Sequence, residues 1–229
     1  MNFKTRSLKT ERLDDSRTPA SEIRRSLDFM RFVNARLGGT RAVIDYFEKA
    51  RTPDRFSVLD LGSGGGDIPF ALVRWAEHKG KTVHVTAVDL NPHCLDYARE
   101  KFKSPIIQFL NCSAFDFETL GHFDYVVSSM FFHHLSEEEI VLLLRRMEQH
   151  GRRGFLVNDL LRSRLHYLGA SLISFFTFKD ILLSDARLSV LRGFREEDLV
   201  RYRQKTGIPF EIKRKPFFRI LMSHEKRPD

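Results

Sequence analysis

The chain has 229 residues, of which 42% are hydrophobic and 30% charged. This suits one α/β domain with a substantial core, excludes a disordered chain, and offers no apolar stretch long enough to cross a bilayer. The net charge of +8 could indicate a nucleic-acid partner, but the basic residues are spread along predicted helix faces without exposed aromatics, so nucleic acid is an unlikely partner.

The N-terminal residues carry no secretory signal. Residues 1–20 are charged and lack an apolar centre, and their proline and small polar residues favour a turn, so a flexible lead is predicted there. The two cysteines, Cys94 and Cys112, have neither disulfide nor metal-ligand spacing. We therefore expect a cytoplasmic protein with no metal site and a single domain over residues 21–229.

Two amphipathic helices are predicted over residues 21–52, before the first strand. The first ends at Gly38-Gly39, and the second runs from about Thr40 to Ala50. Together they could form a helical lid. Polar side chains that could reach an acceptor from such a lid are Asn34, Arg36 and Arg41.

The most informative motif comes next. The apolar run 58–61 breaks into alternating glycines, Gly62, Gly64 and Gly66, and helical spacing then resumes. This pattern predicts a strand, a tight turn and a helix start, by which α/β proteins hold nucleotides. A dinucleotide-binding turn needs glycine at its sixth position, where this chain has Asp67.

Acidic residues near the turn indicate which nucleotide is bound. Asp60 and Asp67 would repel a pyrophosphate but suit a ligand that carries a sulfonium and an ammonium. The second predicted strand, 83–89, ends in Asp89 roughly 20 residues past the glycines, where an acid accepts hydrogen bonds from both ribose hydroxyls. This charge balance favours S-adenosylmethionine over NAD as the cofactor.

Strands and helices continue to alternate, which implies a parallel sheet. Asn91-Pro92 predicts a helix start, and Ser136 to Glu139 is a capping box. Further strands are predicted at 106–110, 125–129 and 154–159, and after a helix at 196–205 two extended runs, 210–213 and 217–222, would close the sheet as an antiparallel pair.

The segment formed by residues 160–193 is too long for a plain strand-to-helix connection, and long insertions tend to be functional. We interpret the segment as a helical cap insertion over the substrate. Its large apolar residues are Tyr167, Leu168, Leu172, Ile173, Phe175, Phe176, Phe178, Ile181, Leu182 and Leu183.

From about Ser57 to Asp159 the motifs VLDLGSGGG, AVDLNP and FDYVVSSMFFHHL resemble those of class I S-adenosylmethionine-dependent methyltransferases. The overall pattern is similar to the group that includes quinone-biosynthesis and polyketide-tailoring enzymes. The resemblance implies a Rossmann-like, doubly wound seven-stranded sheet with an antiparallel last strand, to which the N-terminal lid and the insertion after strand 5 are added. It also implies a cofactor over the carboxyl ends of the first strands.

Where many relatives carry an aspartate for the adenine amino group, this chain has Ser113. Adenine recognition could rest on the Ser113 hydroxyl, the Ala114 amide or Asp116 in a shifted register. Ser129 would present acceptors to the methionyl ammonium. The cofactor-binding candidates are Asp60, Gly62, Gly64, Gly66, Asp89, Leu90, Ser113, Ala114 and Ser129.

Methyl transfer mainly requires alignment of acceptor, methyl and sulfur, and a phenol or alcohol acceptor also requires a base. His133 and His134 follow the fourth strand and Asp159 ends the fifth, so they are the catalytic candidates. We hypothesise that one of them polarises an acceptor hydroxyl. Each also has a structural interpretation, as a packed histidine or a turn-capping acid.

The leading function is therefore an S-adenosylmethionine-dependent methyltransferase for a small, rather hydrophobic acceptor, through oxygen or carbon, because such ligands bind in mainly apolar pockets. A second possibility is an RNA or protein acceptor. Against it, enzymes that methylate amino groups of bases usually carry an Asn-Pro-Pro-Tyr-type element after the fourth strand, and residues 128–131 lack one. A third is a non-catalytic cofactor-binding or assembly subunit that uses residues 168–183 for a partner or membrane-surface contact. The sequence carries no signal for the oligomeric state.

Overall fold

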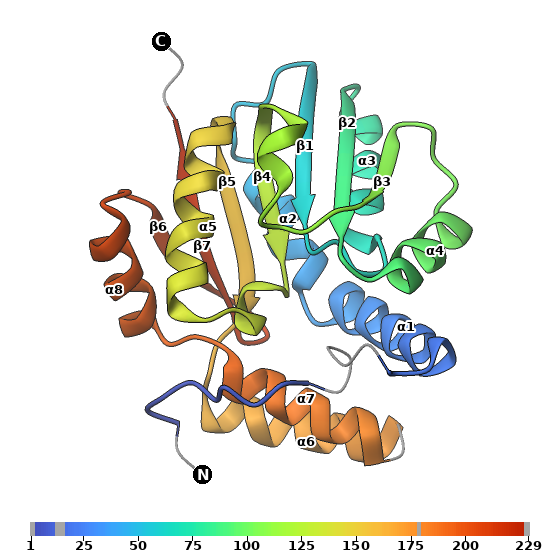
Figure 1. Ribbon diagram of the computed structural model, residues 1–229, viewed down its shortest axis with the longest axis vertical. Helices are drawn as coiled ribbons and strands as arrows, with labels where there is room; N and C mark the ends of the chain where they lie inside the picture. Colours follow the sequence, from blue (N-terminus) through green and yellow to red (C-terminus); the bar gives the residue numbers. More distant parts are fainter. Residues whose placement is uncertain (1–2, 12–16, 178–179, 227–229) are drawn as a thin grey trace.

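A computed structural model describes residues 3–11, 17–177 and 180–226, built around a central sheet (Figure 1). The seven strands lie in the order β3-β2-β1-β4-β5-β7-β6. Their bounds are β1 Arg55–Leu61, β2 Thr82–Asp89, β3 Ile107–Asn111, β4 Phe123–Ser129, β5 Gly151–Leu160, β6 Glu211–Lys215 and β7 Arg219–Glu225.

The strands β1 to β5 pair in parallel, while β7 is antiparallel to both of its neighbours, β5 and β6. This confirms the predicted mixed sheet with antiparallel closing strands. The strand order reverses between β1 and β4. In open α/β sheets ligands bind at such a reversal, outside the carboxyl ends of the strands.

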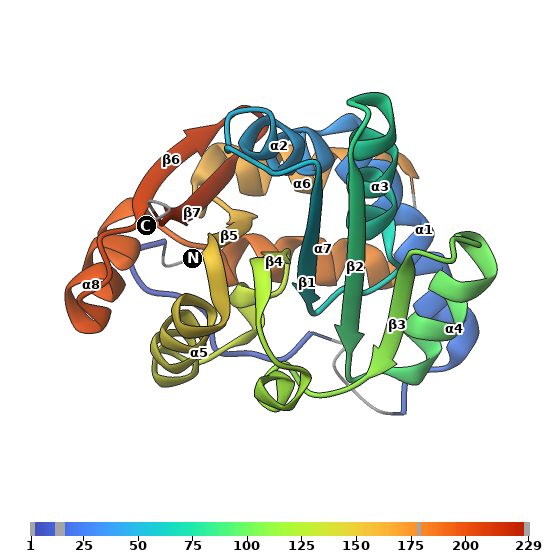
Figure 2. The same cartoon turned by 90° about the horizontal axis from the view of Figure 1, so that it is seen from above.

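Helices cover both faces of the sheet (Figure 2). In β1, Val58 packs in the cluster on one face, whereas Leu59 and Leu61 pack in the cluster on the other. This period of two, with both sets apolar, is typical of a doubly wound sheet. The helices of the Val58 face are α2 Gly39–Phe47, α3 Asp67–His78 and α4 Pro92–Lys101, and those of the opposite face are α5 Glu137–His150 and α8 Glu196–Thr206.

Local capping signals set where two of these helices begin. The side chain of Asn91 accepts a hydrogen bond from the backbone of His93, with proline at the first helical position of α4. At α5 the Ser136 hydroxyl and the Glu139 carboxylate form the reciprocal bonds of a capping box. Both helix starts were predicted from sequence.

Three further helices lie beyond the carboxyl ends of the parallel strands (Figure 1). They are α1 Ala20–Arg36, α6 Arg164–Thr177 and α7 Asp180–Arg192, the last two side by side. The first helix of the expected lid, α1, and the helices of the expected cap, α6 and α7, thus lie at the edge where ligands bind, whereas the second helix of the expected lid, α2, packs on a face of the sheet. Of the insertion's apolar residues, Phe178 lies outside the described residues, and so do the side chains of Ile173, Phe175, Phe176, Ile181, Leu182 and Leu183.

Two local expectations differ from the structure. Residues 3–11 lie in the predicted flexible lead, yet they pack on the domain, where Arg6 donates to backbone carbonyls of His133, Leu135 and Arg192. The last strand begins at Arg219 instead of residue 217, because Phe217 and its neighbour have φ of 58° and 57° and form a turn. No helix in the described ranges combines the length and apolarity needed to cross a bilayer.

Candidate functional site

The glycine turn joins β1 to α3 at the reversal of strand order. Gly62, Gly64 and Gly66 have φ of 67°, 51° and 77°, in the left-handed region that favours glycine. The Gly64 amide donates to the Asp89 carboxylate at 2.8 Å, which holds the turn against the end of β2. The pocket beside the turn is lined by residues of α1, the turn, the start of α3 and the end of β4, including Asn34, Asp60, Ser129 and Met130.

Gly62 is also confined by its neighbour, because a Cβ there would lie 2.4 Å from Cγ of Phe131. Gly62→Ala is expected to destabilise the protein about 2 kcal/mol more than the control Gly80→Ala. Gly80 has a similar φ of 69° but nothing within 4 Å of an added Cβ. Urea unfolding of both variants measures the difference, and equal losses would show that Phe131 gives way freely.

Three carboxylates surround the turn. Asp60 is 1% exposed, and its Oδ1 has no hydrogen-bond partner. Burial, together with the nearby charges of Asp67 and Asp89, raises the pKa of Asp60 well above its ordinary value. Burial also raises the pKa of Asp67 and of Asp89. A buried carboxylate oxygen without a partner is costly, so this site is suited to a cationic ligand or a hydrogen-bond donor.

Asp89 ends β2, and its two oxygens accept the amides of Gly64 and Asn91, both at 2.8 Å. The next residue, Leu90, is 72% exposed. The end of β3 lies beside this acid, because the Cys112 amide donates to the Asp89 carbonyl at 3.2 Å. The two carboxylate oxygens are therefore held between the glycine turn and the start of α4, next to the loop that follows β3.

That loop contains the three alternatives for base recognition. The Ser113 hydroxyl accepts a hydrogen bond from the Phe115 amide at 3.1 Å, Ala114 is buried, and Asp116 is exposed at the start of the short helix η2 Phe117–Leu120. All three stay candidates for the adenine contact.

Ser129 ends β4 and lines the pocket. Its hydroxyl accepts from Asn158 Nδ2 at 2.9 Å, and the same amide group donates to the Gly39 carbonyl at 3.3 Å. Asn158 is fully buried, and its Oδ1 has no partner. Met130 follows with φ of 59°, a strained value for a residue with a side chain.

His133 and Asp159 form a buried pair on the other face of the sheet. Nδ1 of His133 lies 2.7 Å from Asp159 Oδ1, and the side chains are 2% and 0% exposed. Burial alone would raise the pKa of Asp159, but the charge and hydrogen bond of His133 lower it overall. Nε2 of His133 lies 3.6 Å from Oε1 of Glu11, from the N-terminal segment. His133 is therefore covered, and neither it nor Asp159 lines the pocket beside the turn.

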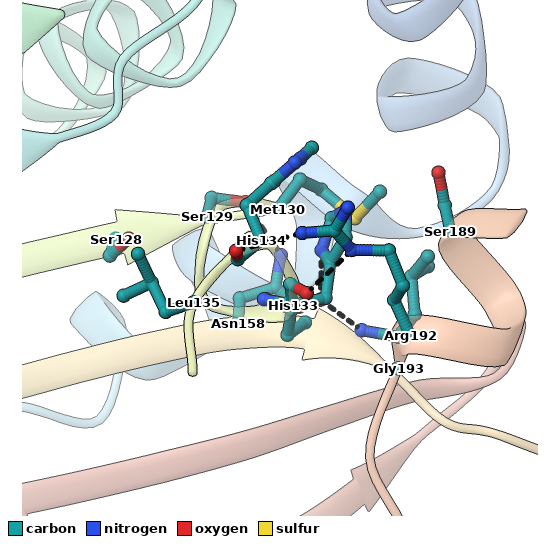
Figure 3. A network of polar contacts seen from close by, with 12 residues as sticks. Ser128, Ser129, Met130, His133, His134, Leu135, Asn158, Ser189, Arg192 and Gly193 are labelled. Atoms are coloured by element: carbon teal, nitrogen blue, oxygen red, sulfur yellow. Dashed lines mark hydrogen bonds and ion pairs between the residues drawn. The ribbon is translucent and has the colours of Figure 1, made fainter. Parts of the chain in front are cut away.

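Arginines hold the loop that carries these histidines, the short helix η3 Phe132–His134. Figure 3 shows Arg192 of α7 reaching the backbone carbonyls of His133 and His134, at 3.0 and 2.7 Å. Glu11, His133 and His134 offer ligand atoms within 4.8 Å of one another, as a metal site would. However, a guanidinium nitrogen of Arg192 lies 4.0 Å from Oε1 of Glu11. The positive charge next to this carboxylate is therefore already provided by Arg192.

The N-terminal helices carry three polar residues that were predicted to reach an acceptor, and only one of them lines the pocket. Asn34 is 4% exposed and lines the pocket, where its Nδ2 donates to Asp67 at 3.0 Å. Arg36 lies over the exposed ring of Phe32 and Arg41 pairs with Asp45, and neither arginine lines the pocket.

Two residues of this region were missed by sequence reasoning. Arg219, the first residue of β7, is 1% exposed and donates to Oδ1 of Asn34 at 3.2 Å. His166 of α6 stacks on Phe218 and donates from Nδ1 to the Leu161 carbonyl at 2.9 Å. Burial lowers the pKa of His166 to about 4, so its ring is neutral. No local sequence signal distinguishes either residue from an ordinary surface base.

Residues 58–154 match the model of a family described as a methyltransferase domain. No curated protein matches the sequence significantly.

Solved structures share the fold at low identity. The TehB-like SAM-dependent methyltransferase of Corynebacterium glutamicum is 17% identical with a TM-score of 0.60, over 91% of this chain and 100% of that one. Human N-acetylserotonin methyltransferase, in complex with SAM, is 17% identical with a TM-score of 0.62, over 91% of this chain but only 56% of its own. Magnesium protoporphyrin IX methyltransferase of Synechocystis PCC 6803, with bound SAH, is 14% identical with a TM-score of 0.52, over 87% and 81% of the two chains.

Proposed function

We propose that the protein transfers a methyl group from S-adenosylmethionine to a small, rather hydrophobic acceptor, at oxygen or carbon, and that it uses the region in which residues 58–154 match the model of a methyltransferase domain. The observation that carries the proposal is the unpartnered carboxylate oxygen of Asp60, buried beside the glycine turn. It fits a donor that brings an ammonium and a sulfonium, and it would repel a pyrophosphate.

The residues around the turn fit such a donor. Asp60 and Ser129 would hold the methionyl ammonium, and Asp89 the ribose hydroxyls. Ser113, Ala114 or Asp116 would contact the adenine. When bound, the donor supplies an electrophilic methyl group on a good leaving group, so the protein has mainly to align the acceptor. The glycine turn supports this arrangement. Gly62, Gly64 and Gly65 line the pocket and have no side chains, so a ligand can approach their backbone closely.

The acceptor side is proposed from the position of α6 and α7. Both helices lie beyond the carboxyl edge of the sheet (Figure 1), and Leu165, Leu168 and Leu172 of α6 leave an apolar stripe exposed. An apolar cap of this kind suits a hydrophobic acceptor. For a hydroxyl acceptor we assign the base to the His133–Asp159 pair, with His134 as the alternative. Asp159 would fix the His133 ring and stabilise its protonated form.

The geometry adds a condition to this role for His133. Because Glu11 faces Nε2 of His133, the N-terminal segment has to shift before an acceptor hydroxyl can reach that nitrogen. The proton removed from the acceptor would then rest on Nε2, and Asp159 at Nδ1 would stabilise the resulting cation.

Titration calorimetry with S-adenosylhomocysteine and with NAD tests the cofactor directly. We expect saturable binding of S-adenosylhomocysteine and none of NAD. Incubation of the protein with labelled S-adenosylmethionine and a fractionated native extract is then expected to label a small apolar product. Absence of binding to both S-adenosylmethionine and its demethylated product, or binding of NAD, would refute the proposal, and label confined to RNA or protein would refute the acceptor class.

A further inference from the structure

Arg219 is a buried cation without an anion in contact. Its guanidinium donates to Oδ1 of Asn34 and contacts the thioether sulfur of Met130, while its Nε has no partner. Both contacting groups are neutral, and in the described part of the chain no carboxylate forms an ion pair with Arg219. The charges of Asp159 and Asp67 act on it only from further away. A buried charge normally has a close counter-ion, and Arg219 has none in the described part of the chain.

The charge persists at neutral pH. Burial lowers the pKa of Arg219 to about 10, which still leaves the guanidinium protonated under ordinary conditions. Arg219 lies directly opposite Leu160 in the ladder between β5 and β7. It therefore sits at the carboxyl end of β5, at the edge of the sheet where the pocket lies.

The two groups that contact Arg219 both line the pocket. Asn34 is fixed, because its Nδ2 donates to Asp67 and its Oδ1 must then face Arg219. Met130 is different, since a thioether is a weak acceptor on a flexible side chain. Its backbone is also strained at φ of 59°. The Met130 sulfur thus occupies a place that an anionic oxygen would fill better.

We propose that Arg219 binds a carboxylate of a ligand in this pocket, and that the Met130 side chain moves aside when it does. The inference rests on the proposed function, because two ligands of that reaction can supply the carboxylate: the methionyl part of the donor, or an acidic acceptor. Asp60 and Asp67 line the pocket, and Arg219 contacts Asn34 and Met130, which line it as well. Such a distribution suits a ligand with separated positive and negative groups.

Calorimetry on the wild type, Arg219→Met and Arg219→Lys separates the two sources. In the donor arm, S-adenosylmethionine is compared with its decarboxylated analogue, which differs only in the carboxylate. If the donor supplies the group, the wild type prefers S-adenosylmethionine about 10- to 100-fold, Arg219→Met loses the preference, and Arg219→Lys retains part of it.

In the acceptor arm, protein with and without saturating S-adenosylhomocysteine is titrated with acetate and benzoate against acetamide and benzamide. If an acceptor supplies the group, the wild type prefers the carboxylates, and Arg219→Met does not. A folded Arg219→Met protein whose preferences match the wild type in both arms would overturn the inference. So would a wild type with no preference in either arm.

Met130→Ala keeps the test decisive if Arg219→Met does not fold. It exposes the guanidinium without altering it, so the preference for the carboxylate ligand is expected to rise several-fold, and an unchanged preference would count against the inference. Failure of the proposed function is distinguishable, because it would appear as loss of all binding of S-adenosylmethionine and S-adenosylhomocysteine by the wild type.

Discussion

Asp60→Asn is expected to weaken the binding of S-adenosylhomocysteine about 100-fold and, at the same time, to raise the melting temperature of the ligand-free protein. The loss of affinity follows from removing a charged acceptor for the ammonium, because hydrogen bonds to charged groups contribute up to about 3 kcal/mol. The gain in stability follows because the buried carboxylate has an oxygen without a partner. Calorimetry and thermal unfolding measure the two effects.

The pH dependence of the stability gain has a definite sign. The folded-state pKa of Asp60 lies well above the ordinary value of 3.8 because of burial and the charges of Asp67 and Asp89. Between these two pKa values the folded state binds more protons than the unfolded state, so the contribution of Asp60 is full below about pH 4 and declines as the pH rises through the folded pKa. The advantage of Asp60→Asn should therefore be small near pH 4 and grow with pH.

The affinity of the wild type for S-adenosylhomocysteine should rise over the same interval, because the ionised carboxylate binds the ammonium. Asp54→Asn is the matched control, since the Asp54 side chain is 97% exposed just before the same strand. It should change neither property. If Asp60→Asn binds like the wild type, the assignment of Asp60 to the donor fails.

Asp159→Asn is expected to lower the rate of methylation of a hydroxyl acceptor at least about 100-fold, with the affinity for S-adenosylhomocysteine unchanged. The amide keeps the shape of the carboxylate but cannot stabilise a protonated His133. Asp159→Ala should in addition cost about 3 to 5 kcal/mol of stability, because it leaves the buried His133 ring without its partner. Rates with the acceptor from the extract assay and urea unfolding test these effects.

The stability contribution of Asp159 has the opposite pH dependence to that of Asp60. Although burial raises it, the pKa of Asp159 is lowered overall by His133, so this contribution is present above about pH 4 and is lost as the pH falls through the folded pKa. His122→Ala, at the amino end of β4, is the control for removing a histidine away from the site. If alanine variants of His133, His134 and Asp159 all fold, bind the donor and keep wild-type rates, none of the three is the base.

The central sheet could be predicted because its signals are local. The apolar runs, the glycine turn and the caps at Asn91 and Ser136 each act within a few residues, and the strands they predict agree with the structure to within a few positions. The turn before β7 was missed because Phe217 and its neighbour look like strand residues. Their left-handed conformation joins two antiparallel strands and has no local sequence cause.

The candidate site divides in the same way. The position of Asp60, Asp89 and the glycines beside one another could be predicted, because they stand at the ends of two successive parallel strands. The contact between Asn34 and Arg219 joins residues 185 positions apart, and the cover that Glu11 provides over His133 joins the N-terminal segment to the end of β4. In the sequence Arg219 resembles any basic residue of its lysine- and arginine-rich surroundings, and only tertiary packing buries it.

The place of β7 has a consequence for synthesis on the ribosome. β7 follows every other strand in the chain, yet it lies inside the sheet between β5 and β6. Until it emerges from the exit tunnel, β5 is an unprotected edge of apolar residues, the kind of surface that chaperones shield and that aggregates. The contacts of Arg219 with Asn34 and Met130, which both line the pocket, can therefore form only after β7 has been synthesised.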